Sequence, residues 1–357
     1  MAAKSLPAGT RPVADAHRFD VASVERYLRE HIDGFRGPLS VAQFEGGQSN
    51  PTFRLDAPDA SYVLRRKPPG KLLPSAHAVD REFRVMRALA GTAVPVPECL
   101  CLCSDEEVIG SMFYVMRHVE GRVLWDPLLP GMSPDARAAV FDDTNRVIAA
   151  LHAIDPASVG LADYGKPGNY FARQIDRWSR QYKASEIDPI PAMDRLIEWL
   201  PHNIPAGDET AIVHGDYRLD NLIFHPVEPR VIAVLDWELS TLGHPMADFS
   251  YHMMAWRLSG DEFRGLKGAD LASLGIPSEQ AYVSRYLARR GIAKRPDARA
   301  WRFYMAYNMF RLAAILQGVM ARAVAGNASS AKALEAGRRA RPLAERGWAE
   351  AEQLTAS

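Results

Sequence analysis

Three side chains that could bind a metal or accept a proton lie close together in the stretch IVHGDYRLDNLIF, residues 212–224. They are His214, Asp216 and Asn221. The apolar runs on either side of them have the composition of buried strands. Another apolar run, VIAVLDWE, follows after a turn-rich loop and leads into Asp236. The pattern H-x-D-x-x-x-x-N with a later strand-ending Asp therefore predicts a polar loop that strands hold in place.

These residue types suit the chemistry of phosphate and Mg²⁺. Mg²⁺ binds few protein oxygens and completes its shell with water and phosphate, so two oxygen ligands at neighbouring loop ends would serve it. The carboxylate of Asp216 can accept a hydrogen bond from a hydroxyl group and orient that oxygen for in-line attack. Each Asp or Asn alone is an ordinary turn residue, and it is the ordered set that indicates a site. His214 is expected to brace the loop.

Length and charge limit the other possibilities. The chain has 357 residues, more than one hydrophobic core usually serves, so we expect one bilobal domain or two domains. It has 43 Lys plus Arg against 43 Asp plus Glu, so no net field attracts nucleic acid or a membrane surface. No apolar run approaches the ~20 residues of a membrane span, and the first residues lack a signal-peptide core. A soluble cytoplasmic protein is expected, and the sequence leaves its oligomeric state open.

The first third of the chain predicts a small sheet with few helices. Residues 1–18 have the composition of a flexible tail. Two segments have helical spacing, residues 20–32 and 80–91. Short β-rich segments are expected to form an antiparallel meander and two later strands, at residues 40–47, 52–57, 61–68, 97–103 and 110–119. The three cysteines of ECLCLC lie in one of these strands and are expected to act as small apolar side chains of a reduced protein.

The rest of the chain is mostly helical. Long helical patterns cover residues 134–154, 169–187 and 298–326, and a short hairpin carries the motif. The fold class is therefore α+β, with a small antiparallel-sheet lobe that carries one main helix and a larger helical lobe. We place the N-terminal lobe at residues 19–118 and the C-terminal lobe at residues 119–357.

The motif resembles the catalytic loop of protein kinases and, more closely, that of the aminoglycoside phosphotransferase and choline kinase-like family, where HGD and a later DW are typical. The likeness covers roughly residues 40–320. Within that family, the stretches GGQSNPTFRL, YVLRRKPPGKLLPSAHAVDREFRVM and HGDYRLDNLIF resemble the subgroup related to the kinase domain fused to acyl-CoA dehydrogenases. The resemblance implies a bilobal protein kinase-like fold, with a nucleotide-binding N-terminal lobe and a catalytic, substrate-binding C-terminal lobe.

The resemblance also implies roles for residues of the motif. Asp216 becomes the base or the group that orients the substrate. Asn221 and Asp236 become the ligands of Mg²⁺. Arg218 lies where many protein kinases carry a Lys toward the transferring phosphate, and a cation there would offset charge in the transition state. Asp248, at the start of a helix, becomes a brace for the catalytic loop.

In the N-terminal lobe the resemblance implies a nucleotide site. Its expected residues are Gly46, Gly47, Ser49, Asn50, Arg65, Glu82, Met116, Arg117 and Val119. Glycines let backbone N–H groups approach phosphate, although EGGQSN departs from the G-x-G-x-x-G of protein kinases. Arg65 replaces the usual Lys and is preferred over Lys67 as the inward-pointing cation, with Glu82 as its partner. The backbone of residues 117 and 119, in the segment between the lobes, would bind adenine.

The expected activity is that of an ATP- and Mg²⁺-dependent small-molecule kinase that transfers the γ-phosphate to a hydroxyl group. A basic helix face suggests an anionic acceptor such as a hydroxy acid or hydroxyacyl-CoA, and a merely solvated basic face explains it equally well. Its residues are Arg173, Arg177, Arg180 and Lys183, with Arg311 on a later helix. The alternatives are a catalytically silent nucleotide-binding module and an aminoglycoside phosphotransferase. The sequence does not decide between ATP and GTP.

Overall fold

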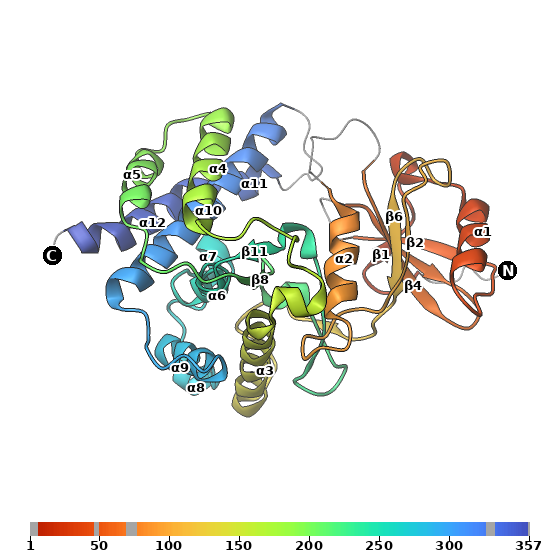
Figure 1. The fold of residues 1–357 in the computed structure, drawn as a ribbon, viewed down its shortest axis with the longest axis horizontal. Helices are drawn as coiled ribbons and strands as arrows, with labels where there is room; N and C mark the ends of the chain where they lie inside the picture. Colours follow the sequence, from red (N-terminus) through yellow and green to blue (C-terminus); the bar gives the residue numbers. More distant parts are fainter. Residues whose placement is uncertain (1–5, 46–49, 69–76, 326–332, 356–357) are drawn as a thin grey trace. The chain divides into compact units, whose positions relative to one another are not determined.

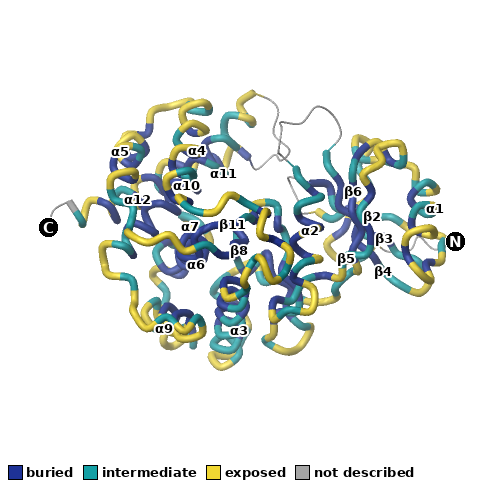
Figure 2. The backbone as a smooth tube through the Cα atoms, in the orientation of Figure 1, coloured by how far each residue is buried: buried dark blue, intermediate teal, exposed yellow. Residues whose placement is uncertain are grey.

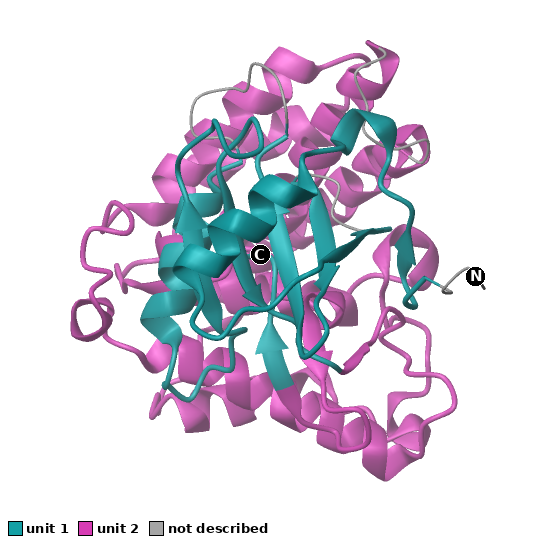
Figure 3. Cartoon of the chain, turned by 90° about the vertical axis from the view of Figure 1, so that its right-hand side faces the viewer, with its two compact units in different colours: residues 1–120, 232–238 teal, residues 121–231, 239–357 magenta. Residues whose placement is uncertain are grey.

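The computed structural model describes residues 6–45, 50–68, 77–325 and 333–355 (Figure 1). Its contacts divide the chain into two compact units, residues 1–120 with 232–238 and residues 121–231 with 239–357 (Figure 3). The sequence placed the boundary between residues 118 and 119, and the contacts place it slightly later. Residues 232–238 return to the first unit, where the N–H of Val234 donates to the carbonyl of Pro95 at 2.9 Å.

The first unit is built on one antiparallel sheet in the order β1-β2-β3-β4-β6-β5. Its strands are β1 (Thr10–Arg11), β2 (Ser40–Phe44), β3 (Thr52–Asp56), β4 (Ser61–Arg66), β5 (Cys99–Cys103) and β6 (Phe113–Arg117). The pairing of β2 with β3 and of β3 with β4 confirms the predicted meander.

The described part of the predicted flexible tail is not free. Thr10 pairs with Phe44 at the edge of the sheet, and a 3-10 helix (Asp15–His17) follows. The prediction was wrong for this segment because composition alone does not reveal that an open strand edge will accept a short partner.

Two helices cover the sheet. In α1 (Val21–His31) the side chain of Asp20 caps the first turn, as predicted, by accepting from the N–H of Ala22 at 3.0 Å. The other helix, α2 (Val79–Leu89), packs against β5 and β6. Leu64 lies in the core that α1 covers. Because neighbouring residues of a strand point to opposite faces, Arg65 is directed to the other face.

The cysteines of β5 behave as the sequence predicted. Cys101 and Cys103 lie in the core beneath α1, Cys99 is partly buried, and all three are free thiols. Burial raises the pKa of the Cys99 and Cys101 thiols to about 12, which keeps them protonated and unreactive at neutral pH.

The second unit is mostly helical. Its helices are α3 (Pro134–Ala153), α4 (Tyr170–Ser185), α5 (Pro191–Trp199), α6 (Pro245–Met253), α7 (Gly260–Phe263), α8 (Leu271–Leu274), α9 (Glu279–Arg289), α10 (Ala298–Val324), α11 (Ala333–Arg338) and α12 (Ala340–Thr355). Figure 2 shows α10 buried along much of its length, and it contacts α4, α6 and α12. Pro342 lies in the first turn of α12, where its missing N–H costs nothing.

Short strands hold the motif. They are β7 (Arg122–Val123), β8 (Ala211–Val213), β9 (Leu222–Phe224), β10 (Val231–Val234) and β11 (Thr241–Gly243). Their pairing is more elaborate than the expected short hairpin, because β8 pairs with β11 while β9 pairs with β7. The loop between β8 and β9 therefore has each of its ends fixed by a different strand. No helix in the described part of the chain combines the length and apolar character that crossing a membrane requires.

Candidate functional site

A buried cation lies at the centre of the candidate nucleotide site in the first unit. Arg65 points from β4 to Glu82 on α2, and its Nε lies 3.0 Å from Glu82 Oε2. The side chain of Glu82 is 1% exposed and also accepts from Asn50 Nδ2 at 3.0 Å and from the Tyr114 hydroxyl at 3.3 Å. The predicted pairing of Arg65 with Glu82 is confirmed.

The same guanidinium holds the predicted metal ligand of this unit. Arg65 Nη2 lies 2.6 Å from Asp236 Oδ1 and 3.6 Å from Glu238 Oε2. Asp236 has a φ of 63°, in the left-handed region that residues other than glycine rarely adopt. Burial by itself would lower the pKa of Arg65, but the charges of Glu82 and Asp236 raise it well above its usual value. Arg65 therefore remains a cation.

Of the other residues in the predicted phosphate-binding loop, the structure describes Asn50. Gly46, Gly47 and Ser49 lie outside the described residues. Asn50 is buried and bonded to Glu82 and to His77 Nδ1, at 3.0 Å each, so in this conformation it supports the carboxylate.

In the segment predicted to bind adenine, part of the backbone already makes hydrogen bonds within the sheet. Met116 is buried in β6. The N–H of Arg117 already donates to the carbonyl of Glu98 at 2.9 Å, and the Arg117 side chain is exposed and pairs with the Glu98 carboxylate. The Arg117 N–H is therefore not a free donor for a base, which leaves the Arg117 carbonyl and the backbone of Val119 as the groups that could serve.

In the second unit, the carboxylate of Asp216 is surrounded by donors. Its Oδ1 accepts from the hydroxyl of Tyr251 at 2.6 Å. Its Oδ2 accepts from Asn221 Nδ2 at 3.0 Å and from Arg218 Nη2 at 3.1 Å. Asn221 Nδ2 also donates to the backbone carbonyl of Asp216 at 2.8 Å. The amide nitrogen of Asn221 is thus committed to Asp216, which leaves its amide oxygen as the possible metal ligand.

A buried carboxylate braces the backbone of this loop. Asp248 accepts from the N–H of His214 at 2.7 Å, from the N–H of Gly215 at 2.8 Å and from His152 Nε2 at 3.1 Å. Burial alone would raise the pKa of Asp248, but the bonds from His152 and His214 lower it overall, so the carboxylate is ionised. His214 also accepts from the N–H of Asp216 through Nδ1 at 3.2 Å. Both residues therefore make the bracing contacts that the sequence predicted for them.

The basic residues proposed for acceptor binding separate into two groups. On α4, Arg180 pairs with Asp176 at 2.5 Å and Lys183 with Asp194 at 2.6 Å, both in exposed positions. These contacts favour the solvated basic face. Arg311 is different, because it is buried and donates from Nη2 to the carbonyl of Gly215 at 2.7 Å. It anchors the loop between β8 and β9.

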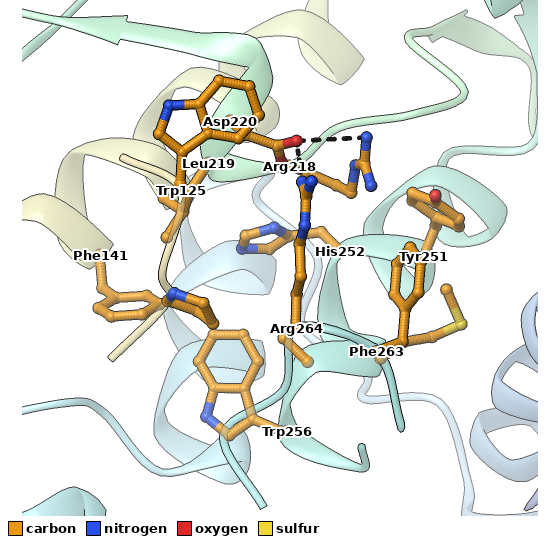
Figure 4. A pocket seen from close by; sticks show the side chains of 13 residues that line it. Trp125, Phe141, Arg218, Leu219, Asp220, Tyr251, His252, Trp256, Phe263 and Arg264 are labelled. Atoms are coloured by element: carbon orange, nitrogen blue, oxygen red, sulfur yellow. Dashed lines mark hydrogen bonds and ion pairs between the residues drawn. The ribbon is translucent and has the colours of Figure 1, made fainter. Parts of the chain in front are cut away.

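A pocket opens beside the loop (Figure 4). Aromatic rings make up much of its lining, contributed by Trp125, Phe141, Tyr251, Trp256 and Phe263. Asp220 forms ion pairs with both Arg218 and Arg264, so the acidic group of the lining is already neutralised. Arg264 in turn lies over the ring of Trp125, which is 60% exposed. The pocket offers apolar surface and two arginines, of which Arg218 contacts the Asp216 carboxylate.

Comparison with known proteins identifies the family and the fold. The model of the phosphotransferase enzyme family matches residues 40–304, so the chain belongs to that family. A crystal structure of an aminoglycoside phosphotransferase-like protein from Ralstonia eutropha JMP134 is 58% identical, with a TM-score of 0.85 over 94% of this chain and 99% of that one. Aminoglycoside phosphotransferase APH(4)-Ia, solved with AMP-PNP and hygromycin B, has a TM-score of 0.57 at 20% identity, covering 91% of this chain and 98% of that one. This second likeness shows the fold alone. The bilobal kinase-like fold predicted from the sequence is confirmed.

Curated relatives identify the subgroup. Acyl-CoA dehydrogenase family member 10 of Mus musculus is 46% identical over 342 residues, which are 95% of this chain and 32% of that protein. Acyl-CoA dehydrogenase family member 11 of Rattus norvegicus is 45% identical over 344 residues, 95% of this chain and 44% of that protein. The chain therefore spans less than half the length of these relatives, and the predicted resemblance to the kinase-like domain of this group is confirmed.

Proposed function

We propose that the protein is an ATP- and Mg²⁺-dependent small-molecule kinase that transfers the γ-phosphate to a substrate hydroxyl group. The arrangement around Asp216 is the observation that carries this proposal. A carboxylate on a braced loop, next to an amide oxygen and a guanidinium, can orient a hydroxyl and supply positive charge for the phosphate. Membership of the phosphotransferase family supports the same reaction.

Each side chain has a defined part in this proposal. Asp216 accepts the hydrogen bond of the acceptor hydroxyl and takes its proton as the new oxygen–phosphorus bond forms. Arg218, which touches Asp216 and is partly exposed, offsets charge on the transferring group. Arg65, held by Glu82, binds phosphate oxygens in the nucleotide site, where a guanidinium can bind in a bidentate manner.

Two oxygen-bearing side chains are proposed to hold Mg²⁺. This ion uses few protein oxygens and completes its shell with water and phosphate. The amide oxygen of Asn221 and the carboxylate of Asp236 are the proposed ligands. Mg²⁺ bound there would neutralise phosphate charge. Asp236 gives one oxygen to Arg65, so its other oxygen is the proposed metal ligand.

For the acceptor we propose an anionic or amphipathic alcohol such as a hydroxy acid or hydroxyacyl-CoA. The aromatic lining beside Asp216 and the cations Arg218 and Arg264 suit an apolar chain with an anionic end. An aminoglycoside is a polycation and needs unpaired acidic groups, whereas Asp220 is occupied by two arginines. The observed charges of this pocket therefore favour the hydroxy acid over the antibiotic.

Transfer of labelled phosphate tests the function. The wild type and Asp216→Asn would be incubated with γ-labelled ATP and Mg²⁺ against a panel of hydroxyacyl-CoAs, free hydroxy acids and aminoglycosides. We expect a labelled product with a hydroxy acid or its thioester, and a loss of about 10³-fold in rate for Asp216→Asn. Labelling of aminoglycosides alone would contradict the proposed acceptor. Nucleotide binding without Asp216-dependent turnover on the whole panel would favour a catalytically silent module.

A further inference from the structure

The shortest contact of the Asp216 carboxylate comes from a residue outside the sequence motif. Tyr251, on α6, donates its hydroxyl to Asp216 Oδ1 at 2.6 Å. Its side chain is buried, with a relative exposure of 5%. Burial raises the pKa of Tyr251, and the negative charge of Asp216 raises it further, so the phenol keeps its proton. Toward this carboxylate, Tyr251 can therefore act only as a donor.

A buried arginine fixes the ring of Tyr251. The guanidinium of Arg311, on α10, lies 5.2 Å from the ring centroid of Tyr251 and 5.7 Å from that of Trp178 on α4. Its Nη2 donates to the carbonyl of Gly215, directly before Asp216. Burial by itself would lower the pKa of Arg311, but nearby tyrosines and Asp216 raise it overall, so it stays charged. One cation thus holds both the backbone of the loop and the ring that contacts its carboxylate.

Resting on the proposed role of Asp216, we propose that Tyr251, held by Arg311, is a positioning residue for that carboxylate. Its hydrogen bond fixes the rotation of the carboxylate about the Cβ–Cγ bond. During transfer the hydroxyl proton passes to Asp216, the acceptor oxygen bonds to phosphorus, and the bond between the γ-phosphorus and ADP breaks. Tyr251 gives up no proton in this step.

The other ionisable groups near Asp216 decide which substitutions can test the role of Tyr251. The ionisable groups that face it within its own unit are Arg218 and His214 of the loop, Tyr251 of α6 and Arg311 of α10. Tyr251→Phe removes one hydroxyl and keeps the ring beneath Arg311, so the other three groups stay in place. Tyr282→Phe is the matched control, because its buried hydroxyl bonds to His252 Nε2 at 2.9 Å instead of to Asp216.

The first test is the release of phosphate from Mg·ATP with water as the acceptor. For Tyr251→Phe we expect kcat to fall about tenfold, the loss of one hydrogen bond to a charged group, with KM for ATP unchanged. Tyr282→Phe should match the wild type in both constants. An unchanged kcat in Tyr251→Phe, or a loss that appears in KM alone, would overturn the proposal.

A second measurement separates this proposal from the proposed function. Thermal unfolding midpoints of the wild type, Tyr251→Phe, Asp216→Asn and the double variant form a cycle that needs no substrate. Non-additive shifts at pH 7 would support the coupling of Tyr251 to Asp216, and additive shifts would overturn it. If the wild type transfers phosphate neither to water nor to any member of the acceptor panel while the shifts are non-additive, the kinase proposal fails and the contact stands.

Discussion

At the scale of single residues, Arg65 is a buried cation that pairs with two carboxylates of the first unit. It neutralises Glu82, which is 1% exposed, and it holds one oxygen of Asp236. A lysine in its place could not contact both carboxylates through separate nitrogens. The guanidinium therefore joins a strand, a helix and the segment after β10 within the first unit.

Removing this guanidinium should cost stability. For Arg65→Met we expect the free energy of unfolding to fall by about 3–5 kcal/mol, because the substitution leaves Glu82 buried without its counter-charge. Arg54→Met is the control, since Arg54 pairs with the more exposed Asp56 and should lose under ~1 kcal/mol. Urea denaturation of both variants measures the difference. Equal losses would show that the buried pair of Arg65 and Glu82 stabilises the fold no more than the more exposed pair of Arg54 and Asp56.

At the scale of elements, the loop between β8 and β9 owes its shape to one glycine. Gly215 has a φ of 84°, and a Cβ atom added there would lie 2.7 Å from the carbonyl oxygen of Leu239. Both the backbone angle and the lack of space require glycine at this position. The residue before the proposed catalytic Asp is therefore fixed by sterics as well as by hydrogen bonds.

Gly215→Ala should therefore be more harmful than an ordinary glycine substitution. Gly131 has a similar φ of 81° with nothing within 4 Å of an added Cβ, so Gly131→Ala isolates the cost of the backbone angle. We expect about 1 kcal/mol for Gly131→Ala and about 3 kcal/mol for Gly215→Ala. Chemical denaturation of the two variants tests this, and equal costs would mean that the loop can shift away from Leu239.

Helix α6 supports the loop and should make stability depend on pH. His252 is buried on it, and burial lowers its pKa to about 4. Between pH 6.5 and 4 the unfolded chain binds a proton at this residue that the folded chain does not, so stability falls as the pH falls. We expect His252→Gln to flatten this slope by up to about 1.4 kcal/mol per pH unit. Urea denaturation from pH 7 to 4.5 measures the slope, and an unchanged slope would contradict a neutral buried His252.

The sequence predicted the local features of these elements better than their long-range partners. Helical spacing located α3, α4 and α10, and the motif identified Asp216 and Asn221. Tyr251 and His152 were not predicted, and Arg311 was considered only for acceptor binding and not as a support of the loop. Their contacts with the loop join residues far apart in the chain, from segments whose spacing indicates only a buried helix. A Tyr or an Arg inside an apolar helix carries no sign of what it faces.

At the scale of the whole molecule, the chain divides its chemistry between its two units. The first contains Arg65, Glu82 and Asp236, and the second contains the braced loop of Asp216 with the aromatic pocket. The sequence predicted this division because β-rich segments lie mainly in the first third of the chain and helical segments in the rest. It could not predict that residues 232–238 belong to the first unit, because that depends on contacts such as the bond from Val234 to Pro95.

Nucleotide binding tests the central claim most directly, because it needs no knowledge of the acceptor. We would measure thermal unfolding with ATP or GTP, with and without Mg²⁺, for the wild type, Asp236→Ala and Asp56→Ala. Asp56 is the matched control, since it also pairs with an arginine and is similarly exposed, 27% against 33%. We predict that Mg·ATP stabilises the wild type and Asp56→Ala, by about 2.7 kcal/mol at a hundred times the dissociation constant, and that the Mg²⁺-dependent part is lost in Asp236→Ala. If saturating nucleotide shifts none of the three proteins, the kinase account is contradicted.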